Sequence, residues 1–251
     1  MRNLLFSLLM GGVSAFTSPA TSAQGEATGL LTRTVHVGGE TYSYQVYVPA
    51  KLRGQKNLPV ILFLHGIGQR GEGGFLPSKG TAGTFARGYL EQVPAIILLP
   101  QCRKGSYWSD AQMERMTVAT LDQTIEEFGA DRKRLYLTGV SMGGYGAWHV
   151  AAQNPGKFAA IVAICGGSPL RSGERFAPIA RRVGTTPAWV FHGAEDRVVP
   201  VSESRQMVEA LKAVSGSRVR YSEYQGVGHN VWLNALSERE LLPWILAQHL
   251  D

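Results

Sequence analysis

Hydrophobic positions in this chain gather into short, nearly continuous runs. Such runs are typical of strands buried on both faces of a parallel sheet, and they cover residues 59–66, 94–100, 134–139, 158–167 and 187–193. Residues 34–49 differ, because apolar and polar side chains alternate there on both sides of Gly38-Gly39. That alternation predicts an antiparallel β-hairpin. The chain should therefore form a mostly parallel sheet with an N-terminal hairpin.

The stretches between these runs carry apolar residues at helical spacing. One clear example is the series Met116, Leu121, Ile125 and Phe128, which recurs as expected for one buried face of a helix. Helices are predicted over residues 84–92, 113–128, 143–153, 202–214 and 238–249. Strands that alternate with helices indicate βαβ units and an α/β, doubly wound sheet. In such a sheet, ligands bind beyond the C-terminal ends of the strands.

Residues 1–23 have a separate character. The sequence MRN precedes an apolar run over residues 4–16, and small residues follow up to Thr21-Ser22-Ala23. This order is typical of a secretory signal peptide, cleaved here before Gln24. A membrane anchor is the competing interpretation, but a span needs about 20 uninterrupted apolar residues. We expect residues 24–251 to form a single domain that is secreted or periplasmic, without stable membrane insertion.

Charge adds a modest basic excess to this picture. The chain has 25 Lys and Arg against 19 Asp and Glu, a formal net charge of +6. The basic residues are scattered and form no run interleaved with aromatic residues, so no nucleic-acid partner is predicted. The loops after the predicted strands carry Arg70, Arg103, Lys104, Arg171, Arg175 and Arg197 against Glu72, Asp110, Glu174 and Glu195. A mildly positive rim follows, and with it the hypothesis that substrates bearing a carboxylate are favoured.

The candidate chemistry centres on Ser141, in the sequence Gly139-Val140-Ser141-Met142-Gly143. The motif is weak by itself in a chain with 30 glycines, because it could mark a plain strand-to-helix turn. Its context is stronger, since it follows a predicted strand and opens a predicted helix. Gly139 and Gly143 then stand where a side chain would collide with the folded-back helix. We expect a strained turn that lifts the Ser141 hydroxyl out of the sheet.

A nucleophilic serine needs a base, and the base needs a carboxylate to orient it. Asp196 lies four residues beyond His192, which ends a predicted strand, and His229 lies in a glycine-flanked loop after the apolar run of residues 219–224. The chain order Ser141, Asp196, His229 is that of an α/β-hydrolase triad. The other histidines fall in the hairpin, at strand ends, on a helix or near the C-terminus. Glu195 remains an alternative to Asp196.

Two further sets of residues complete the predicted site. Acyl transfer needs N–H donors for the oxyanion, for which we expect Met142 together with Ile67, or with Gly68 as second choice. Trp108 and Trp232 are candidate substrate-binding residues in an aromatic-accepting cleft. Both tryptophans could equally be ordinary packing.

Several segments together resemble a known family. The segments LFLHGIGQRGE, LLPQC, DRKRLYLTGVSMGGYGAW, VFHGAEDRVVP and GVGHNVW look like those of bacterial secreted serine hydrolases of the α/β-hydrolase superfamily. The nearest groups are carboxylesterases and predicted peptidases related to dienelactone hydrolase, and feruloyl-esterase and polyhydroxyalkanoate-depolymerase-like esterases. The resemblance implies a carboxylic ester hydrolase whose catalytic residues are Ser141, Asp196 and His229. Its substrate would be a small-molecule or polymer-linked ester.

Two alternatives stay open beside that function. A prolyl-oligopeptidase-like peptidase uses the same triad, although this chain lacks the propeller domain that usually accompanies that activity. A protein that keeps the fold but only binds ligands is the alternative of another class. Substrate turnover distinguishes all three.

Three remaining sequence features limit the shape of the pocket, the need for a metal or cofactor, and the state of the cysteines. Only 21 residues, 166–186, separate two predicted strands where many lipases insert a lid, so an open cleft is expected, suited to short-acyl or aromatic, feruloyl-type esters. No histidine or cysteine cluster has ligand spacing, so no metal or cofactor is expected. Cys102 and Cys165 should be separated by two strands, roughly 14 Å, too far for a disulfide. Two free thiols are predicted.

Overall fold

A computed structural model describes residues 27–72 and 92–251 of the chain. The predicted signal peptide of residues 1–23 lies outside the described residues. The same holds for residues 84–91 of the helix expected over residues 84–92.

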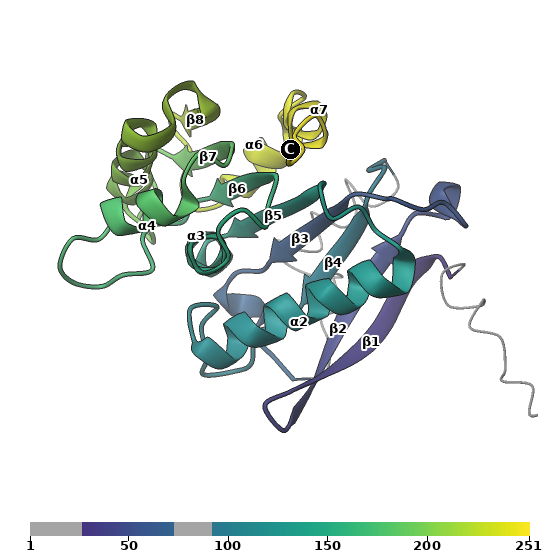
Figure 1. Cartoon of the computed structure of the whole chain (residues 1–251). Coiled ribbons are helices and arrows are strands. Elements are labelled where there is room, and N and C mark those ends of the chain that lie inside the picture. The colour runs from purple at the N-terminus through teal and green to yellow at the C-terminus, as the bar shows by residue number, and fades with distance from the viewer. Residues whose placement is uncertain (1–26, 73–91) are drawn as a thin grey trace, which may run out of the picture.

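Eight strands form one sheet in the order β1-β2-β4-β3-β5-β6-β7-β8 (Figure 1). The strands are β1 (Gly29–Val37), β2 (Glu40–Val48), β3 (Val60–Leu64), β4 (Ile96–Pro100), β5 (Leu135–Val140), β6 (Ala160–Ile164), β7 (Ala188–Gly193) and β8 (Val219–Tyr224). Strand β2 pairs antiparallel with β1 and β4, and every later pairing is parallel. The predicted α/β-hydrolase sheet with an N-terminal antiparallel hairpin is confirmed.

The hairpin owes its tight turn to two glycines. Strands β1 and β2 pair from Gly29 opposite Val48 to Val37 opposite Glu40, which leaves only Gly38 and Gly39 to connect them. Their φ angles are +60° and +79°. A two-residue turn with positive φ at both positions matches the twist of the strands it joins, and glycine adopts it without steric cost.

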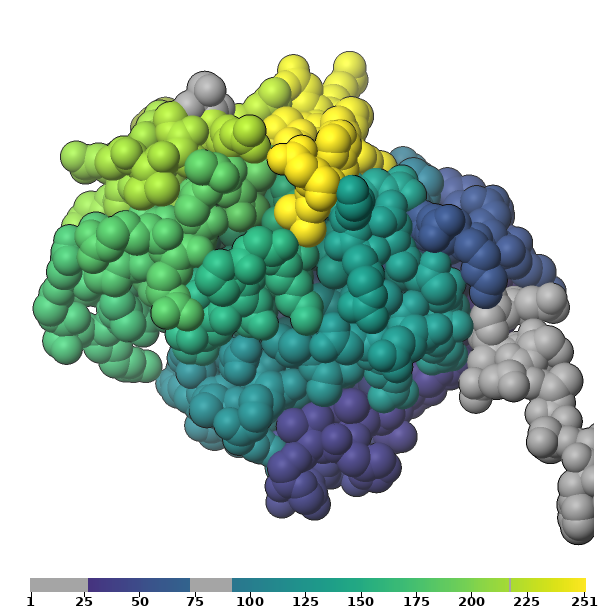
Figure 2. All heavy atoms as spheres, viewed as in Figure 1, coloured from purple at the N-terminus to yellow at the C-terminus, as the bar shows by residue number. Residues whose placement is uncertain are grey.

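Helices cover the sheet on both faces. One core cluster packs side chains of α2 (Ala111–Phe128), α3 (Met142–Gln153), α4 (Ala177–Val183) and α5 (Val201–Ser215) against one face. A second cluster packs α6 (Trp232–Ser237) and α7 (Leu241–Leu246) against the other. The space-filling view shows the purple hairpin well separated from the yellow C-terminal residues, as the strand order requires (Figure 2).

The continuous apolar runs reflect this double cover. In β3, Leu62 and Leu64 belong to the first cluster, whereas Ile61 and Phe63 belong to the second. Successive side chains of a strand point to opposite faces, so a strand covered on both sides is apolar at nearly every position. This is why the strand predictions from sequence were accurate to within a few residues.

The helix predictions were less complete. Helices α2, α3 and α5 match their predicted ranges, but the helix expected over residues 238–249 is confined to Leu241–Leu246. The residue Glu238, with φ −66° and ψ 113°, is extended and separates α6 from α7. Neither α4 nor α6 was predicted, because helices of six or seven residues are too short to display a period of 3.6.

The connection from β6 to β7 contains only α4 and a loop over residues 165–176, so there is no lid domain at this point (Figure 1). Cys102 and Cys165 are both buried free thiols, as predicted. Cys102 follows β4 and Cys165 follows β6, and strands β3 and β5 lie between those two strands in the sheet. Among the described helices, none is long and apolar enough to cross a bilayer.

Candidate active site

Ser141 lies in a strained turn between β5 and α3. Its φ and ψ angles are 56° and −118°, a region that costs a non-glycine residue about 1–3 kcal/mol. A Cβ atom on Gly139 would lie 2.0 Å from the carbonyl oxygen of Gly143, and one on Gly143 would lie 1.9 Å from that of Leu64. Only glycine fits at either position. The two glycines thus allow α3 to fold back closely over β3 and β5, as expected from the sequence.

Three side chains from three loops form a hydrogen-bonded chain. The Oγ atom of Ser141 lies 2.9 Å from Nε2 of His229, and Nδ1 of His229 lies 2.7 Å from Oδ2 of Asp196. Asp196 follows β7 and His229 follows β8. Parallel strands deliver both loops to the same sheet edge as Ser141. The structure therefore brings together the three residues that the chain order predicted.

Asp196 is held as an ionised acceptor. It is buried, and its Oδ1 atom accepts hydrogen bonds from the N–H groups of Val198 at 2.8 Å and Val199 at 2.9 Å. Burial acts to raise the pKa of Asp196, but the hydrogen bonds from His229 and these two N–H groups outweigh it and lower the pKa. Glu195, the alternative acid, is exposed instead.

His192 is a buried partner of Asp196 that sequence reasoning treated only as a strand end. Its Nε2 atom lies 3.3 Å from Oδ2 of Asp196 and 2.9 Å from the carbonyl oxygen of Val199, while Nδ1 lies 2.7 Å from Oγ of Ser204. Burial lowers the pKa of His192, so the imidazole is neutral near pH 7 and donates from Nε2. The spacing His-x-x-x-Asp was the available signal.

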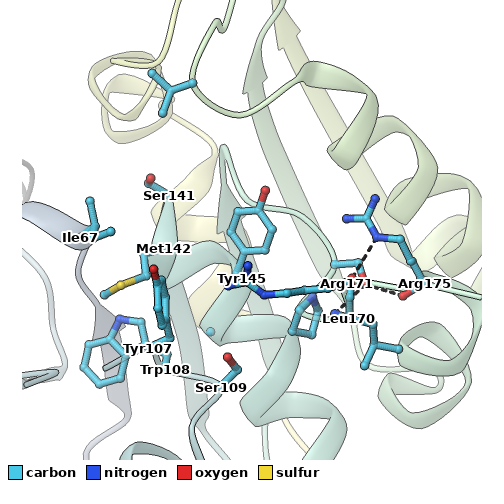
Figure 3. Close-up of a pocket in the computed structure, with 14 residues that line it drawn as sticks. Ile67, Tyr107, Trp108, Ser109, Ser141, Met142, Tyr145, Leu170, Arg171 and Arg175 are labelled. Carbon is cyan, nitrogen blue, oxygen red and sulfur yellow. Dashed lines mark hydrogen bonds between the residues drawn. The ribbon is translucent and has the colours of Figure 1, made fainter. Parts of the chain in front are cut away.

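A cavity of about 380 Å³ opens beside Ser141 (Figure 3). The loop after β3, the loop between β4 and α2, the start of α3 and the loop between β6 and α4 all line it. Its walls include Ile67, Tyr107, Ser141, Met142, Tyr145, Leu170, Arg171, Arg175 and Val198. The cavity lies at the C-terminal ends of the parallel strands, where the topology predicts a ligand.

The predicted oxyanion donors do not all reach this cavity. Met142, the first residue of α3, and Ile67, the first residue of the short helix η3 (Ile67–Gln69), both line it, but Gly68 does not. The first N–H groups of a helix lack intrahelical partners and are available to a ligand. A Cβ on Gly66 would lie 3.8 Å from Cβ of Ser141, so this loop runs close to the serine. The arrangement favours Ile67 over Gly68.

The structure places one of the two predicted tryptophans at the cavity and the other outside it. Trp108 lines the base of the cavity but is fully buried, and its Nε1 donates to the carbonyl oxygen of His65 at 2.9 Å. The ring of Trp232 lies 6.0 Å from that of His229, outside the residues that line the cavity. Trp108 is thus a packing residue that also forms part of the cavity wall, and Trp232 is partly buried against the second core cluster. The accessible aromatic walls are Tyr107 and Tyr145, which sequence reasoning missed.

His65 connects the loops on the other side of the serine. Its Nδ1 donates to the carbonyl oxygen of Gly66 at 2.7 Å, and its Nε2 accepts from the N–H of Cys102 at 3.1 Å. Burial lowers the pKa of His65 to about 4. The neutral imidazole therefore joins the loop after β3 to the loop after β4.

One group of potential metal ligands among the described residues overlaps the site. Atoms of Cys165, Asp196 and His229 lie within 4.8 Å of one another. Asp196 and His229 already bind each other, and Sγ of Cys165 donates to the carbonyl oxygen of His229 at 3.7 Å. Burial also raises the pKa of the Cys165 thiol, which opposes the thiolate that a metal needs. These contacts describe a hydrogen-bonded network.

Fold and site together define the class of α/β-hydrolase serine enzymes. The profile of the phospholipase/carboxylesterase family matches residues 109–239, which contain Ser141, Asp196 and His229. The chain belongs to this family of carboxylic ester hydrolases.

Individual relatives point the same way. The chain is 27% identical over 157 residues to the bifunctional acetylxylan esterase/xylanase XynS20E of Neocallimastix patriciarum, across 61% of this chain and 21% of that protein. It is 46% identical over 54 residues to esterase LipC of Mycobacterium tuberculosis, across 21% of this chain and 13% of that protein. The chain thus spans at most 21% of the length of these two relatives.

Solved structures support the fold assignment. A thermostable esterase superposes with a TM-score of 0.76 at 30% identity, over 88% of this chain and 63% of that one. A feruloyl esterase module from Clostridium thermocellum, complexed with sinapinate, superposes with a TM-score of 0.67 at 16% identity, over 89% of both chains. The second likeness concerns the fold alone.

Proposed function

We propose that this protein is a serine esterase that hydrolyses carboxylic esters through an acyl-enzyme. The observation that carries the proposal is the continuous hydrogen-bonded chain from Ser141 Oγ through His229 to Asp196, with distances of 2.9 and 2.7 Å. Membership of the phospholipase/carboxylesterase family supports it.

The mechanism follows from this geometry. Oγ of Ser141 attacks the ester carbonyl while Nε2 of His229 accepts its proton, and Asp196 stabilises the imidazolium that forms. The N–H groups of Met142 and Ile67 stabilise the oxyanion, each worth about 3–4 kcal/mol in such sites. His229 then returns the proton to the leaving alcohol. Water attacks the acyl-enzyme by the same route and regenerates the free serine.

The pocket favours short-acyl or aromatic esters. The connection between β6 and β7 carries no lid domain, so the cleft is open to solvent, and Tyr107 and Tyr145 give it aromatic walls. The similarity to an acetylxylan esterase supports a short acyl group. The fold shared with a feruloyl esterase module is compatible with an aromatic one. Either ester could be free or linked to a polymer.

Export is part of the proposal, because residues 1–23 have the character of a signal peptide. We expect the mature protein to begin at Gln24 and to be periplasmic or secreted. N-terminal sequencing of the protein recovered from cell fractions tests this. An unprocessed N-terminus in the cytosolic fraction would refute it.

The activity test compares the mature protein with Ser141→Ala on p-nitrophenyl acetate, p-nitrophenyl palmitate, methyl ferulate and a proline p-nitroanilide. We expect turnover of the acetate and the ferulate, weak turnover of the palmitate, and loss of all activity in Ser141→Ala. Cleavage of the anilide alone would identify a peptidase. No turnover of any substrate would favour a binding protein.

A further inference from the structure

The mouth of the cavity exposes an unusual share of the apolar surface. Seven large hydrophobic side chains among the described residues are exposed, and four of them, Ile67, Tyr107, Leu170 and Val198, line this one cavity. Apolar side chains that cluster at the surface mark binding sites. The mouth is therefore shaped to cover an apolar portion of a ligand.

Arg175 contributes no free charge to this mouth. Its guanidinium forms a bidentate ion pair with Glu203, with Nη2 at 2.8 and 2.9 Å from the two carboxylate oxygens, and its Nε donates to the carbonyl oxygen of Leu170 at 2.9 Å. The hydroxyl of Ser168 donates to the carbonyl oxygen of Arg175 and accepts from the N–H of Leu170. These bonds hold the loop after β6, and with it the position of Arg171.

Arg171 and Arg70 are different, because neither forms an ion pair within the described part of the chain. Both guanidinium carbons lie 5.6 Å from the centroid of the Tyr107 ring. Arg70 donates to the carbonyl oxygen of Ser106 at 3.2 Å. In Figure 3 the Arg171 side chain extends from the loop after β6 toward the middle of the cavity. Two cations thus flank one exposed aromatic ring.

Two carboxylates of the predicted rim have partners other than these arginines. Asp110 accepts the N–H of Tyr107 at 2.9 Å, and Glu174 pairs with Arg181 at 3.3 Å. An anion bound beside the Tyr107 ring is attracted by both positive charges. Guanidinium groups match the planar geometry of a carboxylate. The apolar rim strengthens the attraction, since it excludes water from the contact.

We propose that the site selects esters whose acyl or alcohol portion ends in a carboxylate, with an apolar segment of several atoms between that carboxylate and the ester bond. Arg171, assisted by Arg70, binds the carboxylate, while Tyr107 and its apolar neighbours cover the segment. This specificity rests on the proposed esterase function. It narrows the substrate class from esters in general to monoesters of dicarboxylic acids or esters of hydroxy acids.

The experiment uses two matched pairs of esters that differ only in charge. The acyl-side pair is mono-p-nitrophenyl adipate and its N-methyl amide. The alcohol-side pair is 3-(4-acetoxyphenyl)propanoate and the corresponding propanamide, each followed by release of the phenol. For the preferred side we expect kcat/KM to be at least about tenfold higher for the charged ester at low salt, the scale of one charge-assisted hydrogen bond. The preference should fall in 0.5 M NaCl, because salt screens exposed charges.

Variants assign the preference to the two arginines. The ratio of charged to neutral kcat/KM should fall to near one in Arg171→Gln and in Arg70→Gln/Arg171→Gln. Because both esters of a pair are measured on the same variant, a general loss of activity lowers both kcat/KM values equally and leaves their ratio unchanged. Arg132→Gln is the matched control, since it removes an exposed arginine from the loop between α2 and β5 that does not line the cavity, and it should keep the wild-type ratio and rates.

The outcomes separate this inference from the esterase proposal. Hydrolysis of the neutral esters without a charge preference in either pair overturns the inference and leaves the esterase intact. A preference that survives Arg70→Gln/Arg171→Gln also overturns it. If no ester in either pair is cleaved, the esterase proposal fails and the inference falls with it.

Discussion

Nε2 of His192 lies 3.3 Å from Oδ2 of Asp196, the same oxygen atom that meets Nδ1 of His229 at 2.7 Å. His192 is fully buried and touches neither Ser141 nor the cavity. It therefore acts as a positioning residue. The imidazole restrains the carboxylate from behind, while Ser204 and the carbonyl of Val199 restrain the imidazole.

Replacement of His192 should lower the turnover rate more than substrate binding. In His192→Ala we expect kcat for a neutral p-nitrophenyl ester to fall by roughly 10- to 100-fold, because a small displacement of a catalytic group has effects on that scale. KM should stay within about twofold. His192→Gln keeps an N–H donor and should recover part of the loss. Equal losses in both variants, or a change confined to KM, would contradict a positioning role.

The acid of the triad can be tested with two adjacent residues. Asp196→Asn keeps the shape of the side chain but removes the charge that stabilises the imidazolium, so kcat should fall by about 10⁴-fold. Glu195→Gln is the matched control, since Glu195 is exposed, and its kcat should stay within about twofold of wild type. Steady-state kinetics on p-nitrophenyl acetate measures both. The reverse pattern would assign the acid to Glu195.

The sequence predicted the positions of the strands and the triad, because the strands appear as short apolar runs and the triad residues follow those runs in a fixed chain order. Strand β3 is apolar at every position since both faces are covered, and the loops after β5, β7 and β8 are adjacent because parallel strands end at one edge. Trp108 shows the limit of this reasoning. Its place after β4 suggested a substrate contact, yet its burial depends on the missing side chain at Gly146, where a Cβ would lie 2.4 Å from that of Trp108.

The pocket walls could not be predicted for a related reason. Tyr107 and Trp108 are neighbours in sequence, but one is exposed and the other fully buried. Only the path of the loop decides which of them is exposed at the mouth of the cavity. Likewise, Arg171 and Arg175 both belonged to the predicted positive rim. Glu203, 28 positions beyond Arg175, forms an ion pair with Arg175 but not with Arg171.

The two aromatic neighbours give opposite predictions for substitution. Trp108→Phe removes the donor to the buried carbonyl oxygen of His65, so the free energy of unfolding should fall by about 1–3 kcal/mol, with little change in KM. Tyr107→Ala removes an exposed wall of the cavity, so KM for an aromatic ester should rise while stability stays nearly constant. Urea denaturation and ester kinetics on both variants test this. A raised KM in Trp108→Phe would restore its role as a substrate contact.

The close approach at the serine turn predicts a severe stability effect. Gly139→Ala would place Cβ 2.0 Å from a backbone oxygen, so the strand and helix would have to separate, and we expect a loss above about 4 kcal/mol or no folded protein. Gly156→Ala is the control, because Gly156 has open space around it and a positive φ of +73°, so that backbone strain acts there without a steric clash. Its cost should be about 1–2 kcal/mol. Comparable urea midpoints for the two variants would contradict the steric explanation.

Acid should destabilise the protein through His65. Its pKa is lowered by burial from 6.5 to about 4 in the folded state, so between these values the unfolded chain binds a proton that the folded chain excludes. The contribution is complete above pH 6.5 and is lost as the pH falls toward 4. The depressed pKa implies a loss of about 3 kcal/mol in the free energy of unfolding across this window. His192, whose pKa is also lowered by burial, contributes in the same direction.

Urea denaturation from pH 7 to pH 4 tests this prediction. The free energy of unfolding should fall less steeply with pH for His65→Gln than for wild type, whatever the variant's stability at pH 7. Identical slopes would mean that His65 takes up a proton in the folded protein as readily as in the unfolded chain.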